Sequence, residues 1–293
     1  MCKIPFVLAA TAVAGMAILS CNSSGTADNK SDSSVTAAPA KNYLADSFIN
    51  INGANIFYTV KGSNSPAVVF ISGFGDDNQT WQQVQDSIAP LALTLSYDRA
   101  GLAKSAYSNQ PKNAEAIIGE LKQLVDSLNI PKPFILVGHS LGGNLEKIYA
   151  HTYPADIKAL VFIDPGYNEE ALQKIISPAL WLQREVAIKK YTPALNTAQQ
   201  MEKKALNNIA RYSDSIHEVP NVPITFFTAT LTFADFPASG DEIKVKQASH
   251  ASWLKYMPQA KHIIVPTSRH YIQNDNPEIR QCGQKWLVNS AET

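Results

Sequence analysis

Short runs of apolar residues recur along the chain, separated by longer stretches in which apolar and polar residues alternate or mix. The first two runs, at residues 48–51 and 56–60, flank Asn52-Gly53, a strong signal for a two-residue hairpin turn. Further runs are short and almost wholly apolar, and they lie at residues 67–72, 91–97, 133–137, 159–163, 224–228 and 262–265. Strands covered on both faces have this composition. The pattern therefore predicts a mostly parallel sheet that begins with an antiparallel hairpin.

Helical periodicity fills several of the gaps between these runs. Residues 114–128 repeat their apolar positions at helical spacing, and residues 145–153 are also compatible with a helix. Alternation of strands and helices is typical of a doubly wound α/β sheet. The stretch at about residues 166–221 breaks this rhythm, because it is too long for a simple connection and contains no strand-like run. Its amphipathic segments predict an inserted helical cap.

The first 21 residues have the pattern of an export signal. Lys3 precedes an apolar run at residues 4–19, which is shorter than the ~20 residues that a membrane-spanning helix needs. The run ends in ILSC, which resembles the bacterial lipobox, in which the cysteine is lipidated and becomes the new N-terminus. The small residue Ser20 before Cys21 suits cleavage. We expect an exported bacterial lipoprotein, anchored to a membrane through Cys21 and facing the periplasm or the cell surface.

A polar segment follows the proposed anchor. Residues 22–42 are rich in Ser, Ala, Asp and Thr and contain no aromatic residue. A segment of this composition cannot bury enough apolar surface to fold by itself. We expect it to act as a flexible linker, with the folded domain occupying residues 43–293.

Composition narrows the range of partners. Hydrophobic residues make up 45% of the chain, charged residues 17%, and the formal net charge is zero. A neutral chain lacks the basic excess that favours nucleic acid, so we expect none as a partner. Two of the three cysteines lie in the first 21 residues, which excludes a disulfide framework. Neither an HExxH motif nor a zinc-type Cys/His spacing is present, so we expect no metal and no cofactor.

The strongest chemical motif is GHSLGG at residues 138–143, between a predicted strand and a predicted helix. G-x-S-x-G in this context is a nucleophile elbow. The sharp turn strains the serine, so the residues two positions away on either side must lack side chains. The start of the following helix also favours developing negative charge at Ser140. We therefore expect Ser140 to be a nucleophile.

A serine hydroxyl needs a base that accepts its proton. The candidates are His139, His151, His217, His250, His262 and His270. His270 follows the last predicted strand, and loops at the carboxyl ends of strands carry the chemistry of open α/β sheets. We expect His270 to be the base and the other five histidines to have structural or surface roles.

Over residues 48–290 the chain resembles the α/β-hydrolase family. Besides GHSLGG, SGFG at residues 72–75 resembles the family's HGxG oxyanion loop, residues 98–105 (DRAGLAKS) resemble its DxRGxGxS loop, and residues 268–277 resemble the segment that carries its histidine. The resemblance implies an α/β-hydrolase fold with a catalytic triad. It also implies an oxyanion hole formed by the backbone N–H groups of Phe74 and Leu141.

Two aspartates compete for the role of triad acid, which orients the histidine and stabilises its charged form. Asp164 directly follows the strand at residues 159–163, and Asp235 lies in the loop after the strand at residues 224–228. The family more often uses the second location. We favour Asp164 slightly, because it ends its strand and precedes Pro165-Gly166, whereas Asp235 sits late in a long apolar loop.

These residues favour a cofactor-free carboxylic-ester hydrolase that acts on a small molecule through an acyl-enzyme. A serine rather than an aspartate in the elbow argues against hydrolysis of epoxides and haloalkanes. The alternative is a catalytically idle, membrane-tethered binding protein of the same fold. That alternative is motivated by departures from the family pattern at Ser72, Ala103 and Arg269.

Overall fold

The computed structural model describes residues 45–191, 194–231 and 236–276. The predicted signal segment 1–21 with Cys21, the predicted linker 22–42 and the candidate acid Asp235 lie outside the described residues.

One sheet runs through the described part of the chain. Its strands are β1 (Ala45–Ile51), β2 (Ala54–Lys61), β3 (Val68–Ile71), β4 (Thr94–Tyr97), β5 (Phe134–His139), β6 (Ile157–Ile163), β7 (Ile224–Ala229) and β8 (Ala260–Val265). They are arranged in the order β1-β2-β4-β3-β5-β6-β7-β8. The pairs β1–β2 and β2–β4 are antiparallel and the remaining pairs are parallel, which confirms the predicted mixed sheet with an N-terminal hairpin.

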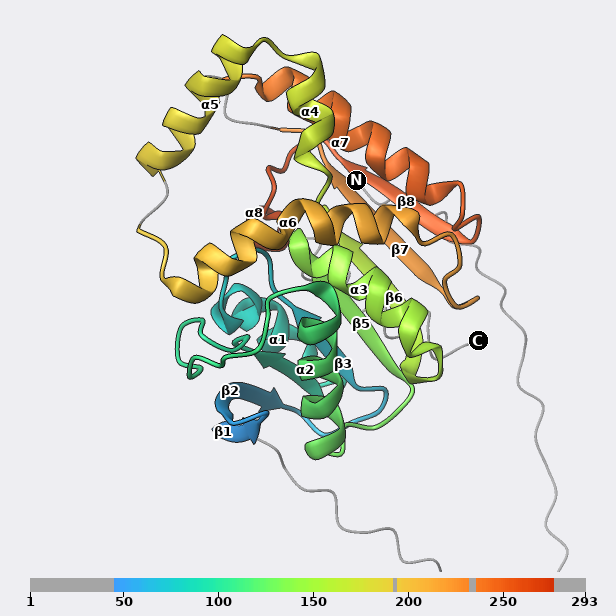
Figure 1. Cartoon of the computed structure of the whole chain (residues 1–293). Helices are drawn as coiled ribbons and strands as arrows, with labels where there is room; N and C mark the ends of the chain where they lie inside the picture. The colour runs from blue at the N-terminus through green and yellow to red at the C-terminus, as the bar shows by residue number, and fades with distance from the viewer. Residues whose placement is uncertain (1–44, 192–193, 232–235, 277–293) are drawn as a thin grey trace, which may run out of the picture. The chain divides into compact units, whose positions relative to one another are not determined.

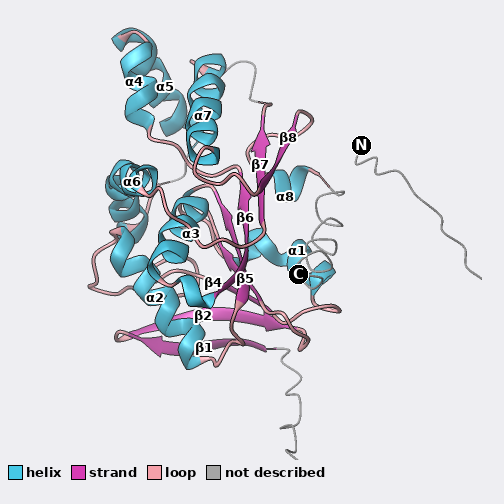
Figure 2. Ribbon diagram, turned by 90° about the vertical axis from the view of Figure 1, so that its right-hand side faces the viewer, coloured by secondary structure: helices cyan, strands magenta, loops and turns pink. Residues whose placement is uncertain are grey.

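Helices lie on both sides of this sheet (Figures 1 and 2). The α-helices are α1 (Gln82–Ile88), α2 (Ala114–Ser127), α3 (Leu141–Thr152), α4 (Glu169–Ile175), α5 (Pro178–Tyr191), α6 (Thr197–Ser215), α7 (Ser239–Leu254) and α8 (Ile272–Asp275), and short 3-10 helices span Asn78–Trp81 and Pro154–Asp156. Figure 2 shows α2, α3 and α6 on one face of the sheet and α1 and α8 on the other. In these residues the chain has the α/β-hydrolase fold.

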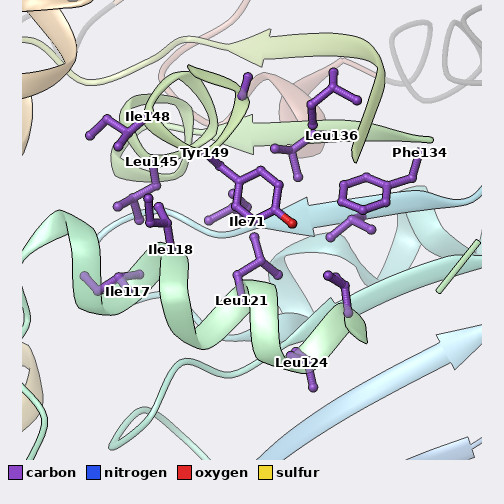
Figure 3. Packing of buried hydrophobic residues seen from close by; sticks show 14 of the residues in the cluster. Ile71, Ile117, Ile118, Leu121, Leu124, Phe134, Leu136, Leu145, Ile148 and Tyr149 are labelled. Atoms are coloured by element: carbon purple, nitrogen blue, oxygen red, sulfur yellow. The ribbon is translucent and has the colours of Figure 1, made fainter. Parts of the chain in front are cut away.

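The wholly apolar strands contribute side chains to two separate hydrophobic cores, one on each face of the sheet. Along β5, Phe134 and Leu136 join the core under α2 and α3, whereas Ile135 and Val137 join the core under α1. Successive side chains of a strand point to opposite faces, so a strand buried on both faces must be apolar at every position. Figure 3 shows the first core, in which Leu121 of α2 faces the strands and α3. Burial of each large aliphatic side chain contributes about 1.5–3 kcal/mol.

Two helices depart from the sequence prediction. Helix α3 begins at Leu141 rather than near residue 145, because the chain enters the helix directly from the elbow. Helix α7 has no counterpart in the prediction. Its inward face buries Lys246 and His250 together with Trp253, so it lacks the apolar stripe by which a helix is recognised.

The region between β6 and β7 carries α4, α5 and α6 and, in its described residues, no strand. Helix α6 starts with a capping box, in which the Asn196 side chain accepts a hydrogen bond from the backbone amide of Gln199 and the Gln199 side chain accepts one from the backbone amide of Asn196. Among the described helices, none has the length and hydropathy required to cross a membrane.

Candidate active site

Ser140 occupies the tip of the turn between β5 and α3. Its φ of 53° and ψ of −121° lie in a region that residues with a side chain rarely adopt. Two glycines allow this turn. A Cβ on Gly138 would lie 2.4 Å from the carbonyl oxygen of Gly142, and a Cβ on Gly142 would lie 2.1 Å from that of Ile71. The turn therefore requires glycine at both positions.

Backbone hydrogen bonds fix the strained serine in place. Its amide donates to the carbonyl of Ile163 over 3.2 Å, and its carbonyl accepts from the amides of Gly143 and Gly166 over 2.9 Å each. The elbow is thereby tied to the end of β6 as well as to its own helix. Since Ser140 directly precedes α3, the positive end of the helix dipole lies beside its hydroxyl group.

His270 lies in the turn after β8, and its side chain remains partly exposed. Its Nδ1 lies 2.7 Å from Oδ2 of Asp164, which is wholly buried at the carboxyl end of β6. Because a carboxylate only accepts, Nδ1 carries the proton, and Nε2 is left with a free lone pair. The described side chains of Ser140 and His270 are not hydrogen-bonded to each other, but both line one cavity. Hydrogen bonds of this kind often tighten only when substrate binds.

The Asp164 carboxylate is held from several directions. Its Oδ1 accepts from the backbone amide of Ala229 over 2.9 Å, and its Oδ2 accepts from Lys246 Nζ over 2.8 Å as well as from His270. Burial by itself would raise the pKa of Asp164, but the hydrogen bond from His270 and the charges of His270 and Lys246 hold that pKa well below its usual range. Asp164 is therefore ionised throughout the neutral range. The structure brings it to His270; the alternative, Asp235, lies outside the described residues.

His139, which precedes Ser140, contacts the segment that carries His270. Its Nε2 donates to the backbone carbonyl of His270 over 3.0 Å, and the two rings lie 4.6 Å apart. Burial lowers the pKa of His139, so the ring is neutral near pH 7. The side chain thus joins the elbow to the loop after β8, in keeping with the structural role expected from the sequence.

The loop after β3 lies beside the elbow and carries the predicted oxyanion residue Phe74. Ser72, where the family usually has histidine, donates from its hydroxyl to the carbonyl of Asp77 over 3.0 Å and so braces the loop from within. Asp98 accepts from the backbone amides of Asn78 (2.7 Å) and Lys104 (3.1 Å) and so joins this loop to the segment after β4.

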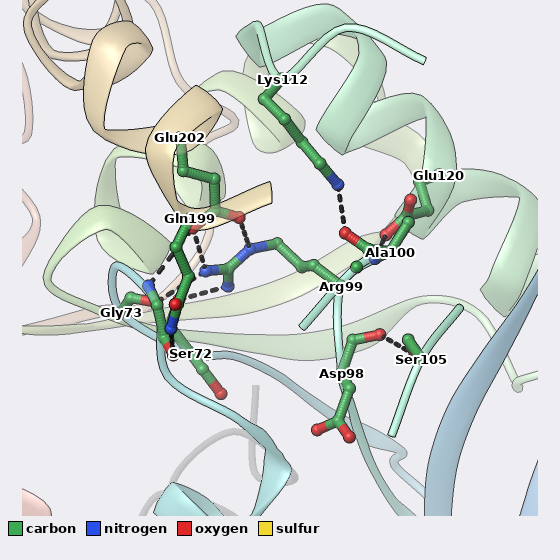
Figure 4. A network of polar contacts seen from close by, with 12 residues as sticks. Ser72, Gly73, Asp98, Arg99, Ala100, Ser105, Lys112, Glu120, Gln199 and Glu202 are labelled. Carbon is green, nitrogen blue, oxygen red and sulfur yellow. Dashed lines mark hydrogen bonds and ion pairs between the residues drawn. The ribbon is translucent and has the colours of Figure 1, made fainter. Parts of the chain in front are cut away.

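Arg99 connects this loop to helix α6 (Figure 4). Its guanidinium donates to the carbonyls of Ser72 (2.8 Å) and Gly73 (2.7 Å) and makes two hydrogen bonds, of 2.7 and 3.0 Å, to the Glu202 carboxylate. Glu202 also accepts from the amide of Gly75 over 3.3 Å. Both side chains of the pair are buried. This bidentate pair therefore fixes α6 and the loop that contains Phe74 in one arrangement.

Ser140, His270, Phe74 and Leu141 line a cavity of about 390 Å³. The cavity is closed mainly by apolar side chains from the segments around β6 and β7, including Pro165, Leu206, Ala210, Leu231, Phe236 and Ile243. A concave and mostly apolar site with a few convergent polar groups is typical of small-molecule binding.

The charged side chains along this cavity occur with partners of opposite sign. Those pairs are Lys246 with Asp164 at 2.8 Å, Arg184 with Glu242 at 2.7 Å and with Glu169 at 3.8 Å, and Arg269 with Asp275 at 3.4 Å. Burial also raises the pKa of Glu169, which weakens its tendency to carry a negative charge. Each charged side chain of the described cavity lining therefore lies 3.8 Å or less from a partner of opposite charge, and Glu169 and Glu242 share Arg184.

Lys246, Glu202 and Arg184 were not predicted as site residues. Lys246 could have been suspected from the spacing of α7, which places it on one face with His250 and Trp253. Glu202 gives no comparable signal, because its partner lies 103 residues away in the sequence. In the described part of the chain, His, Cys, Asp and Glu side chains do not gather into a group of three that could hold a metal ion.

Comparison with known proteins agrees with this architecture. Residues 66–208 match the family model described as alpha/beta hydrolase fold. The uncharacterized protein YqjL of Bacillus subtilis is 25% identical over 227 residues, which cover 75% of this chain and 82% of that protein. Other curated relatives are matched over about a quarter to a half of their length.

Solved structures show the same fold at lower sequence identity. A thermophilic esterase from Thermogutta terrifontis aligns with a TM-score of 0.59 and 17% identity, over 84% of this chain and 97% of its own. An epoxide hydrolase from Vigna radiata aligns with a TM-score of 0.62 and 17% identity, over 84% of this chain and 98% of its own. Since these two proteins carry different activities, the fold does not select the reaction.

Proposed function

We propose that this protein is a serine hydrolase that cleaves carboxylic esters through the triad Ser140, His270 and Asp164. The observation that carries the proposal is the 2.7 Å hydrogen bond from His270 Nδ1 to buried Asp164, beside a cavity that Ser140 also lines. That bond fixes the ring in the tautomer whose Nε2 can accept a proton. A strained serine at a helix N-terminus supplies the nucleophile.

In the proposed reaction, Ser140 Oγ attacks the carbonyl carbon of the ester while its proton passes to His270 Nε2. The tetrahedral intermediate collapses, the carbon–oxygen bond to the alcohol breaks, and His270 returns the proton to the leaving alkoxide. A water molecule then attacks the acyl carbon while its proton passes to His270. The bond from that carbon to Ser140 Oγ breaks, His270 returns the proton to Ser140, and the acid is released. Asp164 stays ionised throughout and stabilises the imidazolium in both halves.

The negative charge that develops on the carbonyl oxygen needs hydrogen-bond donors. The backbone amides of Leu141 and Phe74 are the proposed donors, since both residues line the cavity beside Ser140. Each such donor contributes on the order of 3 kcal/mol to lowering the barrier. The Arg99–Glu202 pair supports this role because it fixes the carbonyls of Ser72 and Gly73, next to Phe74.

The lining of the cavity favours a neutral substrate with an apolar part. Its described charges are already paired, so a charged acyl group would enter an apolar cavity without a counter-charge. Its volume of about 390 Å³ accommodates a small molecule rather than a polymer segment.

A panel of p-nitrophenyl esters tests the proposal. We expect kcat/KM to rise from acetate to medium-length acyl chains, and a succinate monoester of equal length to react much more slowly because of its charge. Ser140→Ala and His270→Ala should each lose activity by about 10⁴-fold or more. His151→Ala, which removes an exposed histidine of α3, is the matched control and should retain activity. Unchanged hydrolysis in Ser140→Ala would refute the proposal, and no hydrolysis by the native protein would favour the idle binding protein instead.

We also propose that Cys21 anchors the mature protein to a bacterial membrane on the periplasmic or cell-surface side. The basis is the lipobox-like sequence ILSC after a short apolar run. The intact mass of the protein purified from a bacterial membrane fraction should show loss of residues 1–20 and addition of a diacylglyceryl group. Cys21→Ser should abolish both changes. A mature protein that begins elsewhere without lipid would contradict the proposal.

A further inference from the structure

Lys246 contacts the candidate acid at the same oxygen as the candidate base. Its Nζ donates to Oδ2 of Asp164 over 2.8 Å, and His270 Nδ1 donates to that oxygen over 2.7 Å. The lysine comes from α7, lies largely buried, and lines the cavity. Oδ2 of Asp164 therefore accepts two hydrogen bonds, and Oδ1 accepts one from the backbone amide of Ala229.

We propose that Lys246 is a positioning residue that shares the Asp164 carboxylate with His270 and thereby keeps His270 unprotonated, and able to act as a base, at lower pH than Asp164 alone would permit. This proposal rests on the proposed Ser140–His270–Asp164 triad. Lys246 acts through Asp164 and is not expected to touch the reacting atoms.

Electrostatics gives the direction of the effect. An isolated buried carboxylate would favour a positive charge on the imidazole, because the two opposite charges would stabilise each other. The ammonium group already supplies a positive charge to Asp164 Oδ2. Protonation of His270 then adds a second positive charge at the same oxygen of the wholly buried Asp164 carboxylate. The neutral ring, which can accept the proton of Ser140, is favoured as a result.

Two other roles for Lys246 fit the structure less well. A lysine that binds an anionic substrate should present an uncompensated charge to the cavity, whereas Nζ is within hydrogen-bond distance of Asp164. A purely structural lysine should join parts of the fold remote from the site. Lys246 instead contacts the one carboxylate that orients His270.

Other titratable and charged groups surround His270, and they are unchanged when Lys246 is altered. In the described residues they are His139 at the end of β5, Asp76 in the loop after β3, His250 on α7, Arg269 and Tyr271 in its own segment, and Asp275 on α8. Arg269 pairs with Asp275, and Tyr271 donates to Asp76. Their influence on His270 is therefore common to the native protein and to its variants at position 246.

The pH dependence of covalent labelling tests the proposal. A fluorophosphonate probe reacts with a serine at a rate that requires the unprotonated base, so the rate rises with pH to a plateau. We expect the midpoint of this rise to move up by about one pH unit in Lys246→Gln, in which the positive charge is removed. Lys246→Arg retains the charge and should keep the native midpoint.

Lys244→Gln is the matched control, because Lys244 lies on the same helix but is 76% exposed and pairs with Asp241. It should label with the native profile. Lys246→Met is measured as a second neutral variant, and circular dichroism establishes that each variant is folded across the pH range.

The outcomes separate the two proposals. A native protein that never labels overturns the proposed function itself. If the native protein labels, and Lys246→Gln and Lys246→Met label with the same pH midpoint as the native protein, the role of Lys246 is overturned and the triad stands. An increase in KM for esters without a shift in midpoint also overturns it, since that result assigns Lys246 to substrate binding.

Discussion

Two buried ion pairs, Arg99 with Glu202 and Lys246 with Asp164, differ in what surrounds the carboxylate. In the first, Glu202 receives two hydrogen bonds from Arg99, whose remaining donors reach the carbonyls of Ser72 and Gly73. In the second, Oδ2 of Asp164 accepts hydrogen bonds from both Lys246 and His270. The first pair joins a guanidinium to a carboxylate, whereas the second adjoins the imidazole of His270, a type of side chain that commonly transfers protons in catalysis.

This difference separates a structural pair from the pair that we propose to be functional. A bidentate arginine pair whose guanidinium also donates to the carbonyls of Ser72 and Gly73 holds α6 and the loop that contains Phe74 in a fixed arrangement. A carboxylate shared between an ammonium group and an imidazole responds whenever the imidazole accepts a proton. Breaking the first pair should mainly affect stability, and breaking the second should mainly affect activity.

The largest effect is expected at the shared carboxylate. Asp164→Asn removes the charge that stabilises the imidazolium and permits the wrong ring tautomer, so kcat/KM for an ester should fall on the order of 10⁴-fold. Parallel measurement of thermal unfolding shows whether the variant is still folded. A loss of activity below tenfold would show that Asp164 is not the triad acid and would direct attention to Asp235.

A smaller effect, on stability, is expected from the other pair. Glu202→Met leaves the guanidinium of Arg99 buried without a counter-charge, so the free energy of unfolding should fall by about 3–5 kcal/mol in urea titrations. The double variant Arg99→Met with Glu202→Met removes both charges and should recover much of that loss. If the double variant were no more stable than the single one, the unpaired charge would not be the cause.

Lys147 extends the comparison to a buried cation whose Nζ makes no hydrogen bond among the described residues. Lys147 on α3 is buried and lies 4.1 Å above the ring of Trp253. Burial lowers its pKa from 10.5 to about 8. Below pH 8 both the folded and the unfolded chain carry the proton, and the folded state is penalised in full. Between pH 8 and 10.5 the unfolded chain binds more protons, so stability rises with pH.

Lys147→Met should therefore stabilise the protein at pH 7 by about 1–3 kcal/mol, because the burial penalty that it removes exceeds the contact with Trp253 and the attraction to Asp214 that it loses. The gain should shrink as pH rises from 8 towards 10.5, which urea titrations at several pH values can follow. Equal stabilisation at every pH would contradict a buried charge as its origin.

The smallest effect is expected at an exposed pair. Lys61 and Asp86 lie 2.6 Å apart, and 56% of the Asp86 side chain is exposed. Asp86→Ala should change the free energy of unfolding by less than about 1 kcal/mol, because water screens the pair. A loss comparable to that of Glu202→Met would show that burial does not account for the difference between the pairs.

Local pattern predicted much of this architecture. The wholly apolar runs correspond to strands because both faces of the parallel strands are covered, and Asn52-Gly53 marks the hairpin between β1 and β2. The glycines of GHSLGG predicted the elbow because only glycine fits the close backbone contacts around Ser140. Each of these features follows from residues near one another in the sequence.

Long-range polar contacts could not be predicted in the same way. The partner of Asp164 on α7 lies 82 residues further along the chain, and the partner of Arg99 on α6 lies 103 residues further. Helix α7 itself was missed because polar side chains occupy its buried face. Polar groups on that face become favourable only once Asp164, Thr228 and Pro165 are present to bind them.

Covalent capture of the nucleophile tests the central claim most directly. The full-length protein is treated with a fluorophosphonate probe, digested, and analysed by mass spectrometry. We predict one adduct per chain, on Ser140, and its absence in Ser140→Ala. An adduct on another residue, or an unmodified native protein that is demonstrably folded, would contradict the assignment of Ser140 as the nucleophile of a serine hydrolase.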